Sequence, residues 1–180
     1  MNTIYETNRL ILRVCDKTDA PLVLNFYERN LTEFAQYEPL DEIQAQTLAF
    51  HENLLYYEQL AFLRQNLIRL FLFQKDNPMQ IIGTISYRNI LTSCYQSCQI
   101  GYKMDSSYRN LGFCKEAIRC ANQIMFEELG LHRIEAIVLP DNAPSIQLMH
   151  SLGFAKEGLL HDKVMLHGLW RDHELYAKIH

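Results

Sequence analysis

One stretch of the chain indicates the fold more strongly than any other: Tyr102-Lys-Met-Asp-Ser-Ser-Tyr-Arg109-Asn-Leu-Gly112-Phe-Cys114. It ends an expected strand, passes through a polar loop with one glycine, and opens an amphipathic helix. The first N–H groups of a helix are unpaired and carry the positive end of its dipole, so this turn suits a phosphate or pyrophosphate. Similar turns also occur where no anion binds, and the residues alone leave both interpretations open. The glycines of a P-loop or a dinucleotide-binding loop are missing.

The chain after this stretch alternates between helices and strands. The helix that starts at Gly112 has an apolar stripe and a C-terminal signal at Gly130. Residues 133–139 are typical of a buried strand, and a short helix with Pro144 in its first turn comes next. Two final strands flank the turn at His167-Gly168.

The chain before the stretch predicts one strand, two helices and an antiparallel meander. Residues 9–15 alternate in hydrophobicity, and Thr18 or Asp19 can then cap a helix that has Pro21 in its first turn. A polar joint near residues 38–41 precedes a second helix. Strands follow at residues 67–74, 80–89 and 97–104. The order of elements predicts a mixed α/β fold with one central, mostly antiparallel sheet flanked by helices.

Composition fits a single domain over residues 1–180. With 48% hydrophobic residues the chain can bury a core, and its length suits one domain better than two. Its formal net charge is −4, whereas non-specific nucleic-acid binding needs a dense basic surface. Its five cysteines lack the paired spacing of a zinc site. We therefore expect a cytoplasmic protein with no metal, no nucleic-acid partner and no membrane segment.

Several motifs resemble those of the GNAT acetyltransferase superfamily. Residues 109–114 are similar to its R/Q-x-x-G-x-G/A loop, and Asn142-Ala-Pro-Ser145 with Leu152-Gly153-Phe154 is similar to its N-x-x-S…G-F motif. Residues 6–13 resemble the E-T-x-R-L-x-L-R opening of the branch that contains the Rim-type ribosomal-protein N-terminal acetyltransferases, and Ile100-Gly101-Tyr102 resembles the I-G-Y strand of that branch. Because the motifs follow one another in order over nearly the whole chain, the resemblance implies a single GNAT-like domain.

The resemblance also implies acetyl-CoA as the acetyl donor and a set of residues that hold it. In the family the loop wraps the pyrophosphate, while the preceding strand and the later short helix complete the donor site. No metal is implied. The donor-binding residues are then Tyr102, Lys103, Met104, Arg109, Asn110, Leu111, Gly112, Phe113, Cys114, Asn142 and Met149.

Amide formation from a thioester needs a neutral amine, a donor to the oxyanion and a proton for the departing thiolate. The resemblance places the oxyanion donor on the strand at residues 102–104. Ser145 is the candidate proton donor, with helix capping as the alternative for its hydroxyl. Glu135 is a candidate base, and an ion pair with Arg133 is the alternative for its carboxylate. Met149 stands where many GNAT enzymes carry a tyrosine that protonates the thiolate, so we expect it to line the pantetheine channel or to pack in the core.

The acceptor side is expected in the segment 28–58, which has seven acidic residues and one basic residue. In the resembled fold this segment forms a wall of the acceptor site, where a negative field would attract cationic amines or basic peptide N-termini. A solvated helix face is the alternative. Within the segment, Glu33, Tyr37 and Glu38 are the candidate acceptor-binding residues.

The function that these residues favour is acetyl-CoA-dependent transfer of an acetyl group to a primary amine, such as a protein N-terminus. A small-molecule amine acetyltransferase and a non-catalytic acyl-CoA-binding module are the alternatives. The expected partners are acetyl-CoA and either a peptide N-terminus or a small cationic amine, and a homodimer is a further expectation. Release of free thiol from acetyl-CoA in the presence of amines would separate an enzyme from a binding module.

Overall fold

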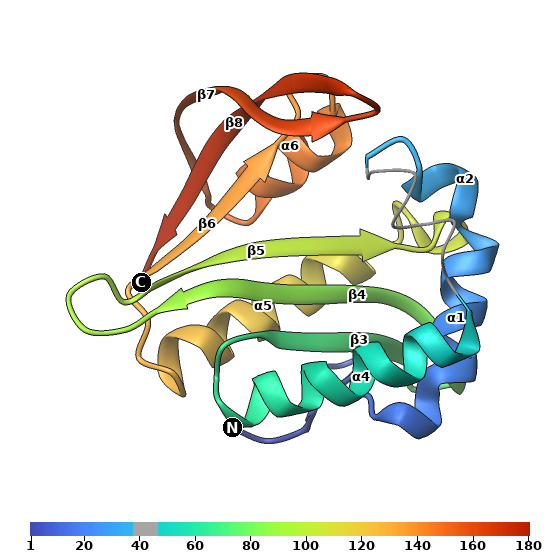
Figure 1. The fold of residues 1–180 in the computed structure, drawn as a ribbon. Helices are drawn as coiled ribbons and strands as arrows, with labels where there is room; N and C mark the ends of the chain where they lie inside the picture. The colour runs from blue at the N-terminus through green and yellow to red at the C-terminus, as the bar shows by residue number, and fades with distance from the viewer. Residues whose placement is uncertain (38–46) are drawn as a thin grey trace.

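The computed structural model describes residues 1–37 and 47–180, which form one sheet between two layers of helices (Figure 1). The strand order is β1-β2-β3-β4-β5-β6-β8-β7. Neighbouring strands are antiparallel, except that β5 and β6 are parallel. The strands are β1 (Ile4–Glu6), β2 (Leu10–Arg13), β3 (Ile68–Gln74), β4 (Asn77–Leu91), β5 (Ser97–Met104), β6 (Arg133–Val138), β7 (Ala155–Leu166) and β8 (Leu169–Ile179).

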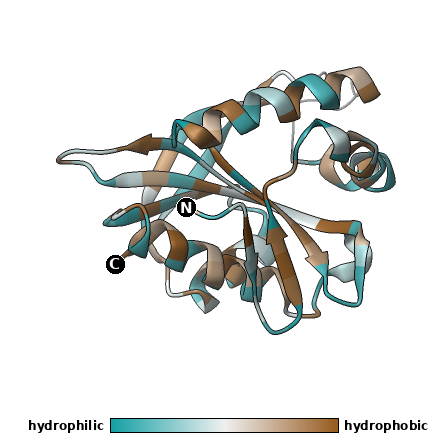
Figure 2. Ribbon diagram, turned by 90° about the horizontal axis from the view of Figure 1, so that it is seen from below, coloured by the Kyte–Doolittle hydropathy of each residue, from teal (hydrophilic) through white to brown (hydrophobic). Residues whose placement is uncertain are grey.

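Helices cover both faces of the sheet, as the view from below shows (Figure 2). Two hydrophobic cores result, because the buried strands carry apolar side chains on both of their faces. On β3, Leu70 and Leu72 belong to the core beneath α5, whereas Phe71 and Phe73 belong to the core beneath α1 and α4. The helices are η1 (Lys17–Asp19), α1 (Ala20–Arg29), α2 (Leu31–Phe34), α4 (Leu48–Leu63), η2 (Ser106–Tyr108), α5 (Phe113–Glu127) and α6 (Ala143–Ser151).

The mixed α/β fold with a mostly antiparallel sheet is confirmed. The strand predicted at residues 97–104 is β5, and the turn predicted at His167-Gly168 joins β7 to β8 with both residues at positive φ. Pairing of β4 with β3 begins at Asn77, so β4 starts earlier than the residue 80 expected from its hydrophobicity. The polar joint predicted near residues 38–41 lies outside the described residues.

The N-terminal prediction was wrong in two details. The single strand expected at residues 9–15 is the second strand of a hairpin, because the chain turns where the Thr7 N–H donates to the Leu10 carbonyl at 2.9 Å. Asp19 is the N-cap residue of α1, as expected, but its side chain makes no capping hydrogen bond there. The side-chain cap belongs to η1 and comes from Asp16, whose carboxylate accepts from the Thr18 N–H at 2.8 Å. The Asp19 carboxylate instead forms a bidentate pair with Arg13, at 2.8 Å for each bond.

The sheet opens between its two parallel strands. Residues 97–99 of β5 pair with residues 133–135 of β6, and beyond that point the strands have no further pairing. In Figure 1, β6 rises away from β5 and α6 packs behind it. The edge of β5 that faces this opening therefore has no strand partner over residues 100–104 in the described sheet, which leaves backbone groups available to a ligand.

Candidate active site

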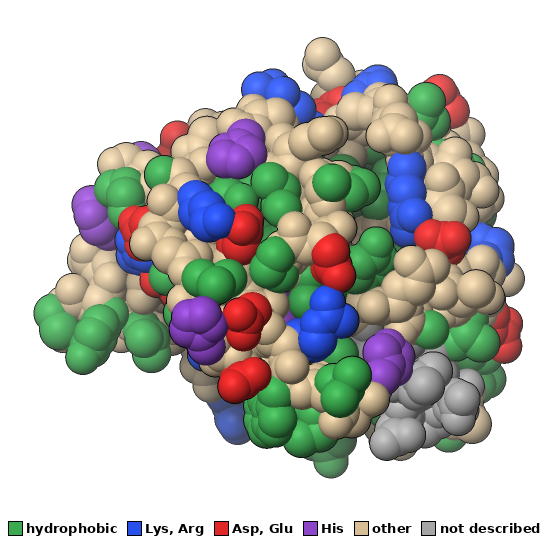
Figure 3. Space-filling view, turned by 90° about the horizontal axis from the view of Figure 1, so that it is seen from above, with side chains coloured by type: hydrophobic (Ala, Val, Ile, Leu, Met, Phe, Trp, Pro, Cys, Tyr) green, Lys and Arg blue, Asp and Glu red, His purple; other side chains and the backbone are tan. Residues whose placement is uncertain are grey.

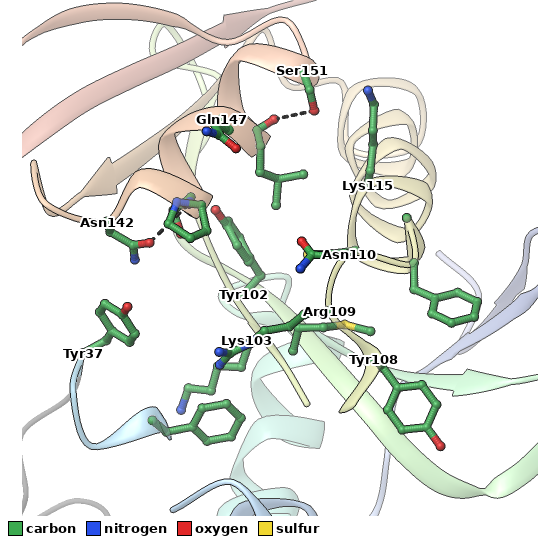
Figure 4. Close-up of a pocket in the computed structure, with 18 residues that line it drawn as sticks. Tyr37, Tyr102, Lys103, Tyr108, Arg109, Asn110, Lys115, Asn142, Gln147 and Ser151 are labelled. Atoms are coloured by element: carbon green, nitrogen blue, oxygen red, sulfur yellow. Dashed lines mark hydrogen bonds between the residues drawn. The ribbon is translucent and has the colours of Figure 1, made fainter. Parts of the chain in front are cut away.

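A pocket of about 680 Å³ lies at this opening, a volume typical of small-molecule sites. Its walls come from the end of β5, the η2–α5 loop, the first two turns of α6 and the segment after α2 (Figure 4). The strand, the loop and the short helix that the sequence associated with a donor site are thus brought together. The described lining residues are Phe34, Tyr37, Tyr102, Lys103, Met104, Tyr108, Arg109, Asn110, Gly112, Phe113, Cys114, Lys115, Asn142, Pro144, Ser145, Gln147, Leu148 and Ser151.

The loop before α5 is shaped as an anion cradle. Asn110 and Gly112 have φ values of 60° and 79°, in the left-handed region that glycine and asparagine tolerate best. Gly112 is the N-cap of α5, and no side chain caps this helix start. The first N–H groups of α5 are therefore available to a ligand, and the dipole makes a negative group the favoured one. The residues present fit a pyrophosphate.

The charged side chains of the described pocket lining are all basic: Lys103, Arg109 and Lys115, with no Asp or Glu. Arg109 donates to the Glu33 carboxylate at 2.8 Å, and both side chains are half exposed. Lys103 donates to the Tyr27 hydroxyl at 3.2 Å and lies 4.6 Å above the Tyr27 ring. Seen from above, the charges on the surface are mixed, with basic and acidic side chains interspersed (Figure 3). The positive character of the pocket suits a polyanionic ligand.

Two hydroxyl groups lie at the α6 wall of the pocket. The Asn142 side chain caps α6 by accepting from the Ser145 N–H at 3.2 Å, which leaves the Ser145 hydroxyl outside the cap. Tyr102 extends from β5 towards this helix start (Figure 4). Its hydroxyl oxygen is buried and has no hydrogen bond in suitable geometry among the described residues. Burial raises the pKa of Tyr102, and the neighbouring Ser145 side chain offsets part of this effect.

Of the residues predicted to touch the donor, Met149 and Leu111 are outside the described pocket lining, whereas Cys114 is part of it. Met149 is fully buried in the core and does not line the pocket, so the core-packing interpretation describes it. Leu111 is 53% exposed, and its carbonyl accepts from Arg9 at 3.0 Å. Cys114 lines the pocket, but burial raises the pKa of its thiol to about 12 and keeps it protonated.

The predicted base and acceptor residues are separated by the fold. Glu135 is outside the pocket lining, and Arg133 donates to its carboxylate at 2.7 Å, as the ion-pair alternative anticipated. Tyr37 lines the pocket, and Glu33 reaches it through Arg109. Glu38 lies outside the described residues.

The acid-rich segment is more strongly paired than the sequence indicated. Glu58 is buried and lies 3.1 Å from the Arg69 guanidinium, so the solvated-face alternative does not describe it. Burial raises the pKa of this carboxyl, and the charge of Arg69 opposes the rise. Glu33 has its own arginine partner in Arg109. Of the four acids of this segment that the structure describes, Glu33 and Glu58 therefore have arginine partners.

The sequence analysis assigned no role to Thr7, Arg9 or Glu116, which support the donor loop from its outer side. The Glu116 carboxylate accepts from the Thr7 hydroxyl at 2.6 Å and from the Arg9 backbone N–H at 3.0 Å. Thr7 and Arg9 belong to the E-T-x-R-L opening, and no local pattern marks Glu116 as their partner. In the part of the chain that the structure describes, no cluster of three metal-ligating side chains is present, and no helix is long and apolar enough to cross a membrane.

Comparison with known proteins gives one consistent result. The family model described as "Acetyltransferase (GNAT) domain" matches residues 9–155. The [Ribosomal protein uS5]-alanine N-acetyltransferase of Escherichia coli is 31% identical over 95% of this chain and 88% of its own length. A Bacillus subtilis protein named probable N-acetyltransferase YjcK is 39% identical over 98 residues, 54% of each chain.

Solved structures agree in fold. A ribosomal-protein-S5-alanine acetyltransferase from Vibrio fischeri superposes with a TM-score of 0.88 at 28% identity, covering 99% of this chain and 97% of that one. Mycobacterium smegmatis RimJ, solved in complex with CoA-disulfide, has a TM-score of 0.86 at 23% identity, over 99% of this chain and 87% of its own. At 23% identity, the likeness to RimJ shows a shared fold and nothing more.

Proposed function

The chain belongs to the GNAT family of acetyltransferases, and on that premise we propose that it transfers the acetyl group of acetyl-CoA to the α-amine at a protein N-terminus. As a member of this family it is an acetyl-CoA-dependent N-acetyltransferase. The nature of the acceptor is the proposed part. The two relatives named for S5 alanine support it, as does one feature of the pocket.

That feature is the lack of a general base among the described lining residues. Among the described lining residues there is no carboxylate and no imidazole to take a proton from an incoming ammonium group. An acceptor that is already neutral in solution is therefore favoured. The pKa of an α-amine is about 7.7–8.0 and that of a lysine amine about 10.4, so roughly a third of α-amines but only about one lysine in a thousand are neutral at pH 7.5. The pocket thus favours an N-terminus over an alkyl amine.

The residues present can perform the remaining steps. Bound acetyl-CoA supplies the acetyl group as a thioester. The loop at residues 109–112 and the first turn of α5 hold the donor by its pyrophosphate. Unpaired backbone on the opening-facing edge of β5 can donate to the carbonyl oxygen as it becomes an oxyanion. The Ser145 hydroxyl can donate a proton to the departing sulfur. We assign no step to Glu135, because Arg133 holds its carboxylate outside the pocket.

A matched pair of peptides tests the acceptor. The first begins with a free alanine and contains no lysine; the second has the same sequence with a blocked N-terminus and one internal lysine. Thiol release and the mass of the product are measured at pH 7.5 with saturating acetyl-CoA. We expect the first peptide to react at least about a hundredfold faster, because of the difference in neutral amine.

The same assay includes spermidine and free amino acids. Faster reaction of these amines or of the lysine peptide would contradict the N-terminal proposal and favour the small-molecule alternative. Donor binding without thiol release for any amine would favour the non-catalytic alternative. The cytoplasmic location and the homodimer remain predictions from the sequence.

A further inference from the structure

The β1–β2 turn, at residues 7–9, is bound to the first turn of α5. Glu116 is the central group of this contact. Its carboxylate accepts from the Thr7 hydroxyl at 2.6 Å, the Arg9 backbone N–H at 3.0 Å and the Arg9 Nε at 2.7 Å. Burial raises the pKa of Glu116, but the hydrogen bonds from Thr7 and Arg9 outweigh it and the pKa is lowered. Glu116 is therefore a carboxylate at neutral pH.

The guanidinium of Arg9 contacts Leu111 and Phe113 and lies beside Gly112, the residue between them. Its Nη1 donates to the Leu111 carbonyl at 3.0 Å. Its central carbon lies 4.3 Å from the centre of the Phe113 ring, in cation–π geometry. Its Nη2 lies 3.3 Å from the point where a Cβ on Gly112 would be. One side chain thus supports the loop along its outer side, while the inner side faces the pocket.

The contacts of Arg9 have two physical effects on the loop, one on its conformation and one on its charge. Asn110 is a non-glycine residue at positive φ, and Gly112 has no side chain to restrict its backbone, so the loop needs outside contacts to hold one shape. In addition, an unpaired carboxylate in the first turn of α5 would repel a pyrophosphate bound at the same helix start. Arg9 addresses both, since it fixes the loop and neutralises Glu116.

We propose that Arg9 is a donor-positioning residue: locked by Glu116, it holds residues 111–113 in the shape that binds the pyrophosphate of acetyl-CoA. The β1–β2 turn then sets donor affinity from outside the pocket. This proposal rests on the use of acetyl-CoA and does not depend on which amine is the acceptor.

Arg9→Ala tests the proposal in steady-state kinetics with three acetyl donors. These are acetyl-CoA, acetyl-dephospho-CoA, which lacks the 3′-phosphate, and acetylpantetheine, which lacks the whole nucleotide and the pyrophosphate. We expect KM for acetyl-CoA to rise about tenfold or more with kcat nearly unchanged, as for the loss of a charge-assisted contact. The same rise should appear with acetyl-dephospho-CoA and should disappear with acetylpantetheine.

Any other pattern of KM changes across the three donors overturns the proposal. A rise that disappears with acetyl-dephospho-CoA would mean that Arg9 contacts the 3′-phosphate directly. Equal losses with all three donors would mean general damage to the fold. No change with any donor would make the contact with the loop dispensable. Calorimetric binding of CoA gives the same comparison without an acceptor, so failure of the N-terminal proposal would leave this test intact.

Further variants separate geometry from charge. Arg9→Lys keeps the positive charge but cannot reach Glu116 and Leu111 together, so we expect it to bind acetyl-CoA about as weakly as Arg9→Ala. Thr7→Val removes one hydrogen bond to Glu116 and should give a smaller rise in KM. This variant provides the test if Arg9→Ala folds poorly. Lys75→Ala is the matched control, because it breaks an exposed ion pair with Glu6, 2.8 Å long, near the same turn without touching the loop. Wild-type KM in Arg9→Lys would contradict the proposal.

Discussion

Ser145, the expected proton donor, shares its wall of the pocket with a second hydroxyl, that of Tyr102. The family resemblance placed a thiolate-protonating tyrosine at the position of Met149, which is instead fully buried in the core. A phenol does reach the pocket, from β5 and not from α6 (Figure 4). A buried hydroxyl without a hydrogen bond costs about 1–3 kcal/mol, so a partner supplied by the bound donor would be stabilising. We therefore propose the two hydroxyls as the groups that can donate a proton at this wall.

Ser145→Ala should lower kcat by roughly a hundredfold, the lower end of the range for acid–base groups, because a thiolate leaves readily. Affinity for acetyl-CoA should hardly change, since the cap on α6 uses the Ser145 backbone N–H and not its hydroxyl. Adding Tyr102→Phe to this variant should cause little further loss if the phenol acts through Ser145. Fully additive losses would show that the two groups act separately. Ser106→Ala, at an exposed position on η2, is the control.

The loop and α5 form the element on which donor binding depends. Gly112 has a φ of 79°, and a Cβ there would lie 3.3 Å from the Arg9 guanidinium. A side chain at this position is therefore strained by the backbone and also displaces the group that supports the loop. Gly130 has a similar φ of 65°, but a Cβ there would meet nothing within 4 Å. Comparing substitutions at the two glycines therefore distinguishes backbone strain from the loss of loop function.

Gly112→Ala should weaken acetyl-CoA binding, and Gly112→Glu should abolish it, because its carboxylate would repel the pyrophosphate. Gly130→Ala should cost a similar backbone strain of about 1–2 kcal/mol and leave binding at the wild-type level. Calorimetry with acetyl-CoA, and the rise in Tm that the donor produces by mass action, measure both effects. Unchanged binding in Gly112→Glu would refute the placement of the pyrophosphate at this loop.

At the scale of the whole molecule, a buried histidine links stability to pH. His51 on α4 is fully buried and stacks on Tyr27 with ring centres 5.4 Å apart. Burial, and then the positive charges of Arg69 and Lys103, lower the pKa of His51 to about 4. In the unfolded chain the pKa is near 6.5, so between these values the unfolded state binds the proton and the folded state does not.

The free energy of unfolding should therefore fall as pH decreases from about 6.5 to about 4, with His51 contributing up to roughly 3 kcal/mol of the loss. His51→Phe and His51→Gln cannot titrate, and both should flatten this part of the profile although they pack differently. Urea unfolding at several pH values measures it. Profiles parallel to that of the wild type would show that His51 has no part in the acid sensitivity.

The order of elements and the donor loop follow from local physics. β3 has a run of four apolar residues and α5 has an apolar stripe, Pro144 falls in the first turn of α6, and Gly112 stands where the loop needs a positive φ. Each of these signals depends on residues within about one helical turn or one strand, so it can be read without knowing the rest of the fold. The same local motifs, taken in order, identified the family.

Only the tertiary structure decided which side chains meet. Arg9 and Glu116 are 107 residues apart, and the opening between β5 and β6 is a property of two strands that share no turn. Glu135 pairs with Arg133, two residues earlier on β6, which is a partner that the strand pattern itself offers; what the tertiary structure decided is that this pair lies outside the pocket. The sequence around a carboxylate or hydroxyl is the same whether the group acts in catalysis or in a structural contact. The group's role is set by how distant segments pack, and a local pattern does not contain that information.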